Sequence, residues 1–226
     1  ENTLSQLEAE SVVRIIRDLG AGLSQIWSST EEPQLLDNTL SHLVIELLAL
    51  FPAEDEPSAA IYIFDAGKFR NSSAGGKLRQ YHMDHRPRAG GTTMYAVQNM
   101  SPLVVNDISA MSPDIPCLSK QALAAGVVAF ANIPLLIRVS GTVRVNGVLL
   151  INFTHPYDFD ESLLSLLLVF AELAATVIEN AKLHQSVVSE QTRLMNETED
   201  LRRISQNLER RANLDAVVEE IIAQLQ

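Results

Sequence analysis

The feature that most constrains the fold of this chain is a pair of apolar runs between Gly126 and Phe153, "GVVAFANIPLLIRVSGTVRVNGVLLINF". A turn-rich segment joins the two runs, which predicts a β-hairpin. Alternate residues of a strand share a face. Both faces of each predicted strand are mainly apolar: in the first strand Ala129, Ala131, Ile133 and Leu135 alternate with Phe130, Asn132, Pro134 and Leu136. We therefore expect this hairpin to be covered on both sides.

Each run carries one asparagine on a face otherwise suited to burial, Asn132 in the first run and Asn152 in the second. Asparagine is depleted in strands, and an amide buried without a partner costs about 1–3 kcal/mol. Loop backbone, water or a ligand must therefore satisfy these side chains. With a ligand, the covered face would be a cavity with converging polar groups.

The segments around the hairpin predict the remaining elements. We expect helices over residues 4–28 and from Pro33 to near Pro52, then a strand in "SAAIYIFDAG". The stretch "FRNSSAGGKLRQYHMDHR" is interpreted as a loop followed by a polar edge strand. Residues 87–118 form a long irregular connection around the short strand "PLVVND", and a connection of that length is usually functional.

Two further helices follow from capping residues. Ser119 is a plausible N-cap of a short helix that stops at Gly126, and Asp158 or Asp160 can cap a long helix from about residue 161. Because helices and strands are segregated along the chain, the fold class is α+β. An antiparallel sheet would have helices on one face, and loops with the short helix on the other.

Four segments in this order resemble a GAF domain: "PLVVND" (102–107), "AGVVAFANIPLL" (125–136), "VNGVLLINF" (145–153) and "YDFDESLLSLLLVFAELAATVIENAKL" (157–183). The resemblance covers most of residues 30–183 and is distantly phytochrome-like. It implies a GAF/PAS-like six-stranded antiparallel sheet, with terminal helices on one face and a small-molecule pocket on the other. It also implies a sensory or regulatory module of a multidomain signalling protein.

The candidate ligand-binding residues follow from strand parity and from this resemblance. In phytochrome-type GAF domains the positions of Phe130, Asn132 and Asn152 face the chromophore. We expect Asn132 and Asn152 to hydrogen-bond a ligand and Phe130 and Leu150 to supply apolar walls. The remaining two candidates, both in the long connection, are Tyr95 and Cys117.

Cys117, the single cysteine, raises an alternative function. It precedes Gly126 by the interval typical of the tetrapyrrole-attaching cysteine in phytochrome-like GAF domains. The usual following His is replaced by Leu118, and aromatic residues make up only 5% of the chain. A tetrapyrrole photosensor and a ligand-free dimerisation module with a filled pocket are the alternatives. No cofactor is identified.

Catalytic and metal sites are not expected. The GAF-fold enzyme that reduces free methionine sulfoxide relies on several cysteines, and nucleophile and phosphate-loop motifs are missing. On an edge strand His82 and Asp84 would share one face and His85 would lie on the other, so they would not converge on a metal. His184 lacks the flanking pattern of a kinase phosphoacceptor.

The net charge and the cysteine content limit which classes of partner and which cellular compartment we expect. The formal net charge of −11 argues against nucleic acid and anionic membrane surfaces as partners. The apolar segment 163–178 is short and interrupted for a membrane span. A single cysteine fits a reducing cytoplasm.

The last third of the chain has a heptad pattern at residues 166, 173, 180, 187, 194, 201 and 208, and Leu183 and Ile204 join the same stripe. This pattern favours a parallel coiled-coil homodimer, weakened where Glu190 and Glu197 occupy core positions. We expect an N-terminal signalling helix (1–29), a GAF domain (30–183) and a coiled-coil linker (184–226) toward a truncated output module, because the chain begins without Met and stops in a helical pattern.

Overall fold

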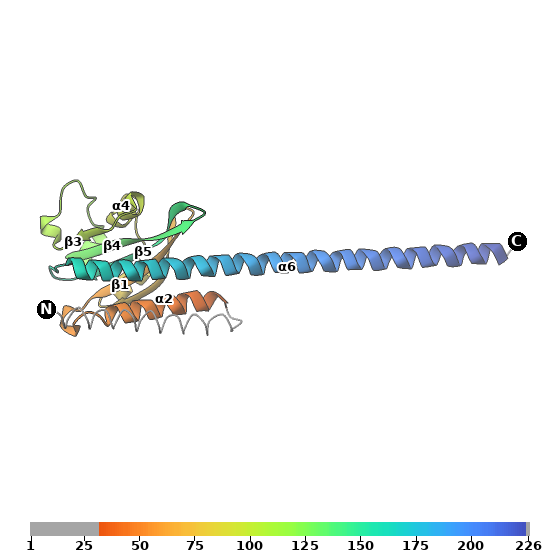
Figure 1. Ribbon diagram of the computed structural model, residues 1–226, viewed down its shortest axis with the longest axis horizontal. Helices are drawn as coiled ribbons and strands as arrows, with labels where there is room; N and C mark the ends of the chain where they lie inside the picture. Colours follow the sequence, from red (N-terminus) through yellow and green to blue (C-terminus); the bar gives the residue numbers. More distant parts are fainter. Residues whose placement is uncertain (1–31, 225–226) are drawn as a thin grey trace. The chain divides into compact units, whose positions relative to one another are not determined.

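A central antiparallel sheet with strand order β2-β1-β5-β4-β3 organises the chain in this computed structural model, which describes residues 32–224 (Figure 1). The strands are β1 Ser58–Asp65, β2 Lys68–Gly76, β3 Leu103–Val105, β4 Ala129–Val139 and β5 Thr142–Phe153. The helices are α2 Glu32–Leu48, α3 Arg79–Asp84, α4 Thr92–Asn99, α5 Lys120–Ala124 and α6 Glu161–Gln224, with short 3-10 turns η1 Ala53–Asp55 and η2 Ile108–Ala110. The predicted α+β class is confirmed. The described sheet has five strands, where the resemblance implied six.

Helices α2 and α6 cover one face of the sheet (Figure 1). The alternate residues of β4 and β5 that point to this face join apolar residues of both helices in the largest core cluster. Its strand members include Ala129, Ala131, Ile133, Leu135, Leu149, Ile151 and Phe153, and its helix members include Leu40, Leu43, Leu47, Leu167, Phe170 and Ile178. Burial of this many aliphatic side chains is the main source of stability for the layer.

Helices α3, α4 and α5 and their connections lie over the opposite face of the sheet. Phe130 packs there with Ala96 of α4 and Ala122 of α5, and Leu150 packs with Val97 of α4. Both faces of the hairpin are therefore covered, as its apolar pattern predicts. The covering layer is built from short elements, and this arrangement leaves room for a cavity.

Three segments differ from the prediction. Residues 68–76 form strand β2, paired with β1, where a loop was expected. Residues 79–84 are helix α3 and not a polar edge strand, and residues 92–99 are helix α4 within the connection expected to be irregular. The alternation that placed His82 and His85 on opposite strand faces therefore does not apply. Tertiary contacts determine whether both helices form, because each is too short to be stable alone and is held by the few side chains that it buries.

The predicted N-caps Asp160 and Ser119 are confirmed. The Asp160 carboxylate accepts a hydrogen bond from the amide of Leu163 at 2.7 Å, and Ser119 Oγ accepts one from the amide of Ala122 at 3.0 Å. These caps satisfy amides that the first turns of α6 and α5 leave unpaired. Pro134 is tolerated within β4 because β3 pairs only with residues 130–132, so that side of β4 has no strand partner at residue 134.

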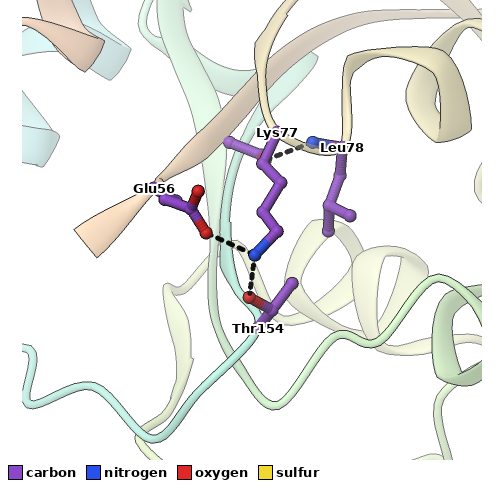
Figure 2. A network of polar contacts seen from close by, with 5 residues as sticks. Glu56, Lys77, Leu78 and Thr154 are labelled. Atoms are coloured by element: carbon purple, nitrogen blue, oxygen red, sulfur yellow. Dashed lines mark hydrogen bonds and ion pairs between the residues drawn. The ribbon is translucent and has the colours of Figure 1, made fainter. Parts of the chain in front are cut away.

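A lysine ties three strand ends together at one end of the sheet (Figure 2). Lys77 follows β2, and its Nζ donates to the carboxylate of Glu56, which precedes β1. The same Nζ donates to the hydroxyl of Thr154, directly after β5, at 3.1 Å. The next amide, of Leu78, donates to Ser58 Oγ at 2.6 Å. These contacts fix the start of the segment that carries α3 over the sheet.

The chain divides into two structural units, Glu1–Ala181 and Lys182–Gln226, and α6 runs through the division. Residues 161–206 include a stretch that is apolar and long enough to cross a membrane by composition alone. The sheet explains much of this apolar character, because Leu167, Phe170, Ala171, Ala174 and Ile178 are core residues. The helix predicted at residues 4–28 and the expected N-terminal signalling helix (1–29) lie outside the described residues.

Candidate functional site

A cavity of about 260 Å³ lies between the sheet and its covering layer. Strands β1, β4 and β5 supply its floor through Tyr62, Phe130, Asn132, Leu150 and Asn152. The roof and mouth come from α3, the start of α4, α5 and the segments between them, including His82, His85, Arg86, Arg88, Thr92, Thr93 and Ser119. The cavity therefore combines apolar walls, such as Phe130 and Leu150, with several hydrogen-bonding side chains.

The two strand asparagines lie on the floor of this cavity, and both are buried. The exposed fraction is 2% for Asn132 and 6% for Asn152. Asn152 Nδ2 lies 3.0 Å from His82 Nε2, so this amide has a partner. Asn132 Nδ2 has no hydrogen-bond partner among the described residues. A buried donor left unpaired in this way costs about 1–3 kcal/mol and calls for an explanation.

His82 on α3 connects the roof to the floor. Its Nε2 faces Asn152, and its Nδ1 lies 3.4 Å from the Tyr62 hydroxyl. That hydroxyl also lies 2.8 Å from the carbonyl oxygen of His82 and 3.0 Å from that of His85, to which it can donate. A neutral His82 with its proton on Nδ1 accepts from Asn152 and donates to Tyr62, which satisfies all of these contacts.

Burial decides the charge states of His82 and Tyr62. It lowers the pKa of His82 from 6.5 to about 4, so the imidazole is neutral at pH 7. Burial also raises the pKa of Tyr62 far above its usual value, so the phenol remains protonated. The floor of the cavity is therefore uncharged at neutral pH, and its polar groups act as hydrogen-bonding groups only.

The mouth of the cavity is basic. Arg86 and Arg88 line it, and within the described residues no Asp or Glu does. The Arg88 guanidinium donates to the carbonyl oxygen of Cys117 at 2.6 Å and so ties the α3–α4 connection to the segment before α5. The stem of Arg88 lies against Gly91, where a Cβ would come within 3.0 Å of Arg88 Cγ.

Four of the six predicted ligand-binding residues line this cavity together: Phe130, Asn132, Leu150 and Asn152. Tyr95 and Cys117 are exposed and do not belong to its lining. The position of the cavity therefore supports a ligand-binding role for the four strand residues and gives no support to such a role for Tyr95 and Cys117.

Sequence reasoning missed His82, Tyr62 and the two arginines as cavity residues. The interpretation of His82 as part of an exposed edge strand is wrong, since its exposed fraction is only 2%. Its burial depends on α3, which no sequence pattern indicated. Tyr62 offered one signal, because it alternates with Ile61 and Ile63 in a strand that is apolar on both faces. Within residues 32–224 no group of three or more His, Cys, Asp or Glu is placed to hold a metal ion.

A family model described as GAF domain matches residues 10–179, which is most of the chain. The chain belongs to the GAF domain family. GAF domains are typically sensory or regulatory modules. A search of curated proteins found no match to this GAF chain.

Solved structures similar to this GAF domain share its fold at low sequence identity. The GAF domain of an Acinetobacter phosphoenolpyruvate-protein phosphotransferase has 17% identity and a TM-score of 0.59, over 80% of this chain and 98% of that one. The corresponding domain from Coxiella burnetii has 17% identity and a TM-score of 0.57, over 77% and 98%. A free methionine-R-sulfoxide reductase from Neisseria meningitidis, solved with its substrate, has 20% identity and a TM-score of 0.52, over 74% and 89%. Since GAF domains of two phosphotransferases and a reductase share the fold, the fold alone does not assign a chemistry.

Proposed function

We propose that this GAF domain is a small-molecule sensor, and that its ligand occupies the cavity between the sheet and helices α3, α4 and α5. One observation carries this proposal: Asn132 Nδ2 is buried beside a cavity of about 260 Å³ and has no partner among the described residues. A ligand oxygen would supply the missing acceptor and remove the cost of the unpaired donor. Phe130 and Leu150 would supply apolar contact surface to the same ligand.

Regulation is favoured over catalysis by the chemistry of the cavity floor. His82 is neutral, Tyr62 is protonated, and both are held by contacts with other protein groups. Cys117, the one thiol, is exposed and outside the lining. These groups are arranged to bind and orient a ligand. We therefore propose a non-catalytic module that reports ligand occupancy to an output domain.

The two alternatives receive less support from the same geometry. A tetrapyrrole attached through Cys117 would need that thiol beside the cavity, and the thiol does not line it. A module with a collapsed pocket would need Phe130 and Tyr95 to fill the space. Phe130 packs against Ala96 and Ala122, Tyr95 is exposed, and the cavity persists.

The sensor proposal is tested by thermal unfolding of the purified chain with a panel of metabolites. We expect at least one compound to raise the unfolding midpoint, and we expect Asn132→Ala to reduce that rise, because it deletes the proposed donor. Losing one hydrogen bond to a buried ligand weakens binding by about 1 kcal/mol, or about fivefold. Asn99→Ala is the control, since Asn99 is exposed and its side chain donates only to Tyr95 O.

Two results would contradict the sensor proposal. The first is a stabilising compound whose effect is the same in wild type, Asn132→Ala and Asn152→Ala. The second is a full metabolite panel that leaves the unfolding midpoint of the wild-type chain unchanged.

We further propose that the protein is a cytoplasmic homodimer that pairs through α6. Support comes from the exposed side chains of the heptad pattern after the division at residue 181. Leu183, Val187, Leu194, Leu201 and Ile204 are each at least half exposed. A second copy of the same helix in parallel register would bury all five in one seam. The dimer would transmit ligand occupancy if the helix pair had two arrangements of similar free energy. A ligand that binds one arrangement more tightly by a few kcal/mol would then shift the equilibrium between them.

A further inference from the structure

The basic mouth of the cavity contrasts with the charge of the whole chain. The formal net charge is −11, with 28 acidic and 17 basic residues, yet the described cavity lining contains Arg86 and Arg88 and no carboxylate. Neither arginine forms an ion pair within residues 32–224. A guanidinium has five N–H donors, and Arg88 is observed to use one toward Cys117 O. Donors and positive charge therefore remain available at the mouth.

The first turn of α4 reaches the same place. Gly91 is its N-cap and has no side chain to accept from the amides of that turn. Thr92 and Thr93, at its first two positions, are buried and line the cavity. The amides at a helix start have no partner within the helix, and the helix dipole favours a negative charge there. Gly91 also lets Arg88 lie directly against this turn, because a Cβ would come within 3.0 Å of its stem.

A separate observation indicates that a ligand belongs in the cavity. The Nδ2 group of Asn132, a side chain only 2% exposed, points to no acceptor among the described residues. Asn132 belongs to β4, so its position is fixed by the sheet and is independent of the α3–α4 connection. The cavity thus combines a cationic mouth, a neutral donor on its floor, and apolar walls from Phe130 and Leu150.

We propose that the cavity binds a small organic carboxylate, with its acid group at Arg86, Arg88 and the first turn of α4, and with an oxygen on its carbon skeleton that accepts from Asn132. This inference rests on the sensor function proposed above and specifies its ligand class. A carboxylate matches the guanidinium fork and is stabilised at a helix start. The apolar walls require a carbon skeleton, which inorganic anions lack.

The experiment is isothermal titration calorimetry on the purified full chain with matched probes. The first probe is levulinate, a short keto acid with both required groups. Levulinamide keeps the keto oxygen and removes the charge, and pentanoate keeps the charge and removes the keto oxygen. Malate, phenylacetate and inorganic phosphate complete the set. We expect the best carboxylate to bind about tenfold more tightly than its neutral amide, because charged hydrogen bonds are the stronger ones.

Variants test which residues cause the preference for a carboxylate over its neutral amide. Arg86→Gln and Arg88→Gln should each weaken the best carboxylate about tenfold and leave the neutral amide unchanged. Asn132→Ala should remove the advantage of levulinate over pentanoate. Arg70→Gln is the matched control, because Arg70 lies on β2 beside Asp37, outside the cavity lining. Should Arg88→Gln unfold the covering layer, Arg88→Lys keeps the charge and removes the fork, and Arg86→Gln still tests the mouth.

Each outcome decides the ligand class. Equal binding of amide and acid, binding of phosphate as tight as that of every carboxylate, or no binding of any carboxylate overturns the inference. These failures are distinct from failure of the sensor function. If a neutral compound stabilises the chain and Asn132→Ala removes its effect, the cavity is a sensor site of a different ligand class. If no compound of any charge acts through Asn132, the sensor function fails as well.

Discussion

At the residue scale, His82 shows how one buried side chain links the covering layer to the sheet. It receives a hydrogen bond from Asn152 on β5 and approaches Tyr62 on β1, although it belongs to α3. Its neutral form satisfies these contacts, while its protonated form would place an N–H against the Asn152 amide and a charge in a buried site. The native structure therefore opposes protonation of His82.

This opposition predicts a pH dependence of stability. Because the pKa falls from 6.5 in the unfolded chain to about 4 in the native structure, the unfolded state binds more protons between these values. The contribution is fully present above pH 6.5 and is lost as the pH falls toward 4. It amounts to about 3 kcal/mol of unfolding free energy. Urea unfolding between pH 7 and pH 4 should show a steeper loss for wild type than for His82→Gln.

The control for this measurement is His42→Gln, since the His42 side chain is half exposed on α2. Its pH profile should follow that of wild type, because the carboxylates that titrate below pH 5 are common to all three proteins. Parallel profiles for wild type and His82→Gln would contradict a neutral, buried His82.

At the element scale, strand β5 carries a glycine where three elements come close together. A Cβ on Gly147 would lie 2.7 Å from the carbonyl oxygen of Tyr62, 2.7 Å from Leu135 Cδ1 and 3.4 Å from Ile178 Cδ1. The neighbouring Asn146 lies at a register shift between β4 and β5, and its Nδ2 donates to the carbonyl oxygen of Ala175 at 2.8 Å. This short segment therefore sets how closely β5 approaches both β1 and α6.

Gly147→Ala should destabilise the domain by about 1–3 kcal/mol, measured by chemical denaturation, because overpacking here pushes against a backbone carbonyl. Gly75→Ala is the matched comparison. Its Cβ would meet only Leu48 Cδ1 at 2.7 Å and Val44 Cγ1 at 3.0 Å among its nearest atoms, and side-chain ends can move aside. We expect the Gly75 substitution to cost less, and an equal or larger cost would refute the argument from backbone contact.

At the scale of the whole molecule, dimerisation is the property on which signalling through α6 would depend. The exposed heptad residues predict a two-stranded coiled coil. Glu190 and Glu197 fall at core positions of the same seam, where a parallel partner would bring like charges together. A seam of this kind is weak in its middle, and this weakness would allow a ligand in the cavity to shift the pairing.

Sedimentation of the purified chain tests this dimer. Leu194→Glu combined with Leu201→Glu should shift the chain from dimer to monomer, because four charges would enter one buried seam. Asn196→Glu is the control, since residue 196 lies away from the heptad core and the substitution adds a glutamate outside the seam. Replacing Glu190 and Glu197 by Leu should tighten the dimer. A monomeric wild-type chain, or a dimer unaffected by the Leu194 and Leu201 changes, would contradict pairing through α6.

The sequence by itself determined the parts of this protein that depend on local periodicity and on chain order. Strand alternation placed Phe130, Asn132, Leu150 and Asn152 on one face, and all four line the cavity. Apolar character on both faces of the hairpin required a covering layer, and the structure has one. Ser119 and Asp160 were recognisable as caps because a side chain and a backbone amide three residues later interact locally.

Only the tertiary structure decided how the covering layer is built and which charges it presents. Helices α3 and α4 are short, and their stability comes from packing on the sheet, so no periodic signal marks them in the sequence. The same packing buries His82, brings Arg88 against Gly91 and leaves Tyr95 and Cys117 exposed. Strands β1, β3, β4 and β5 could be predicted because their apolar pattern repeats along the chain, whereas β2 (Lys68–Gly76) falls on a stretch interpreted as a loop. The mouth of the cavity could not be predicted, because its residues converge only when separate segments meet over the sheet.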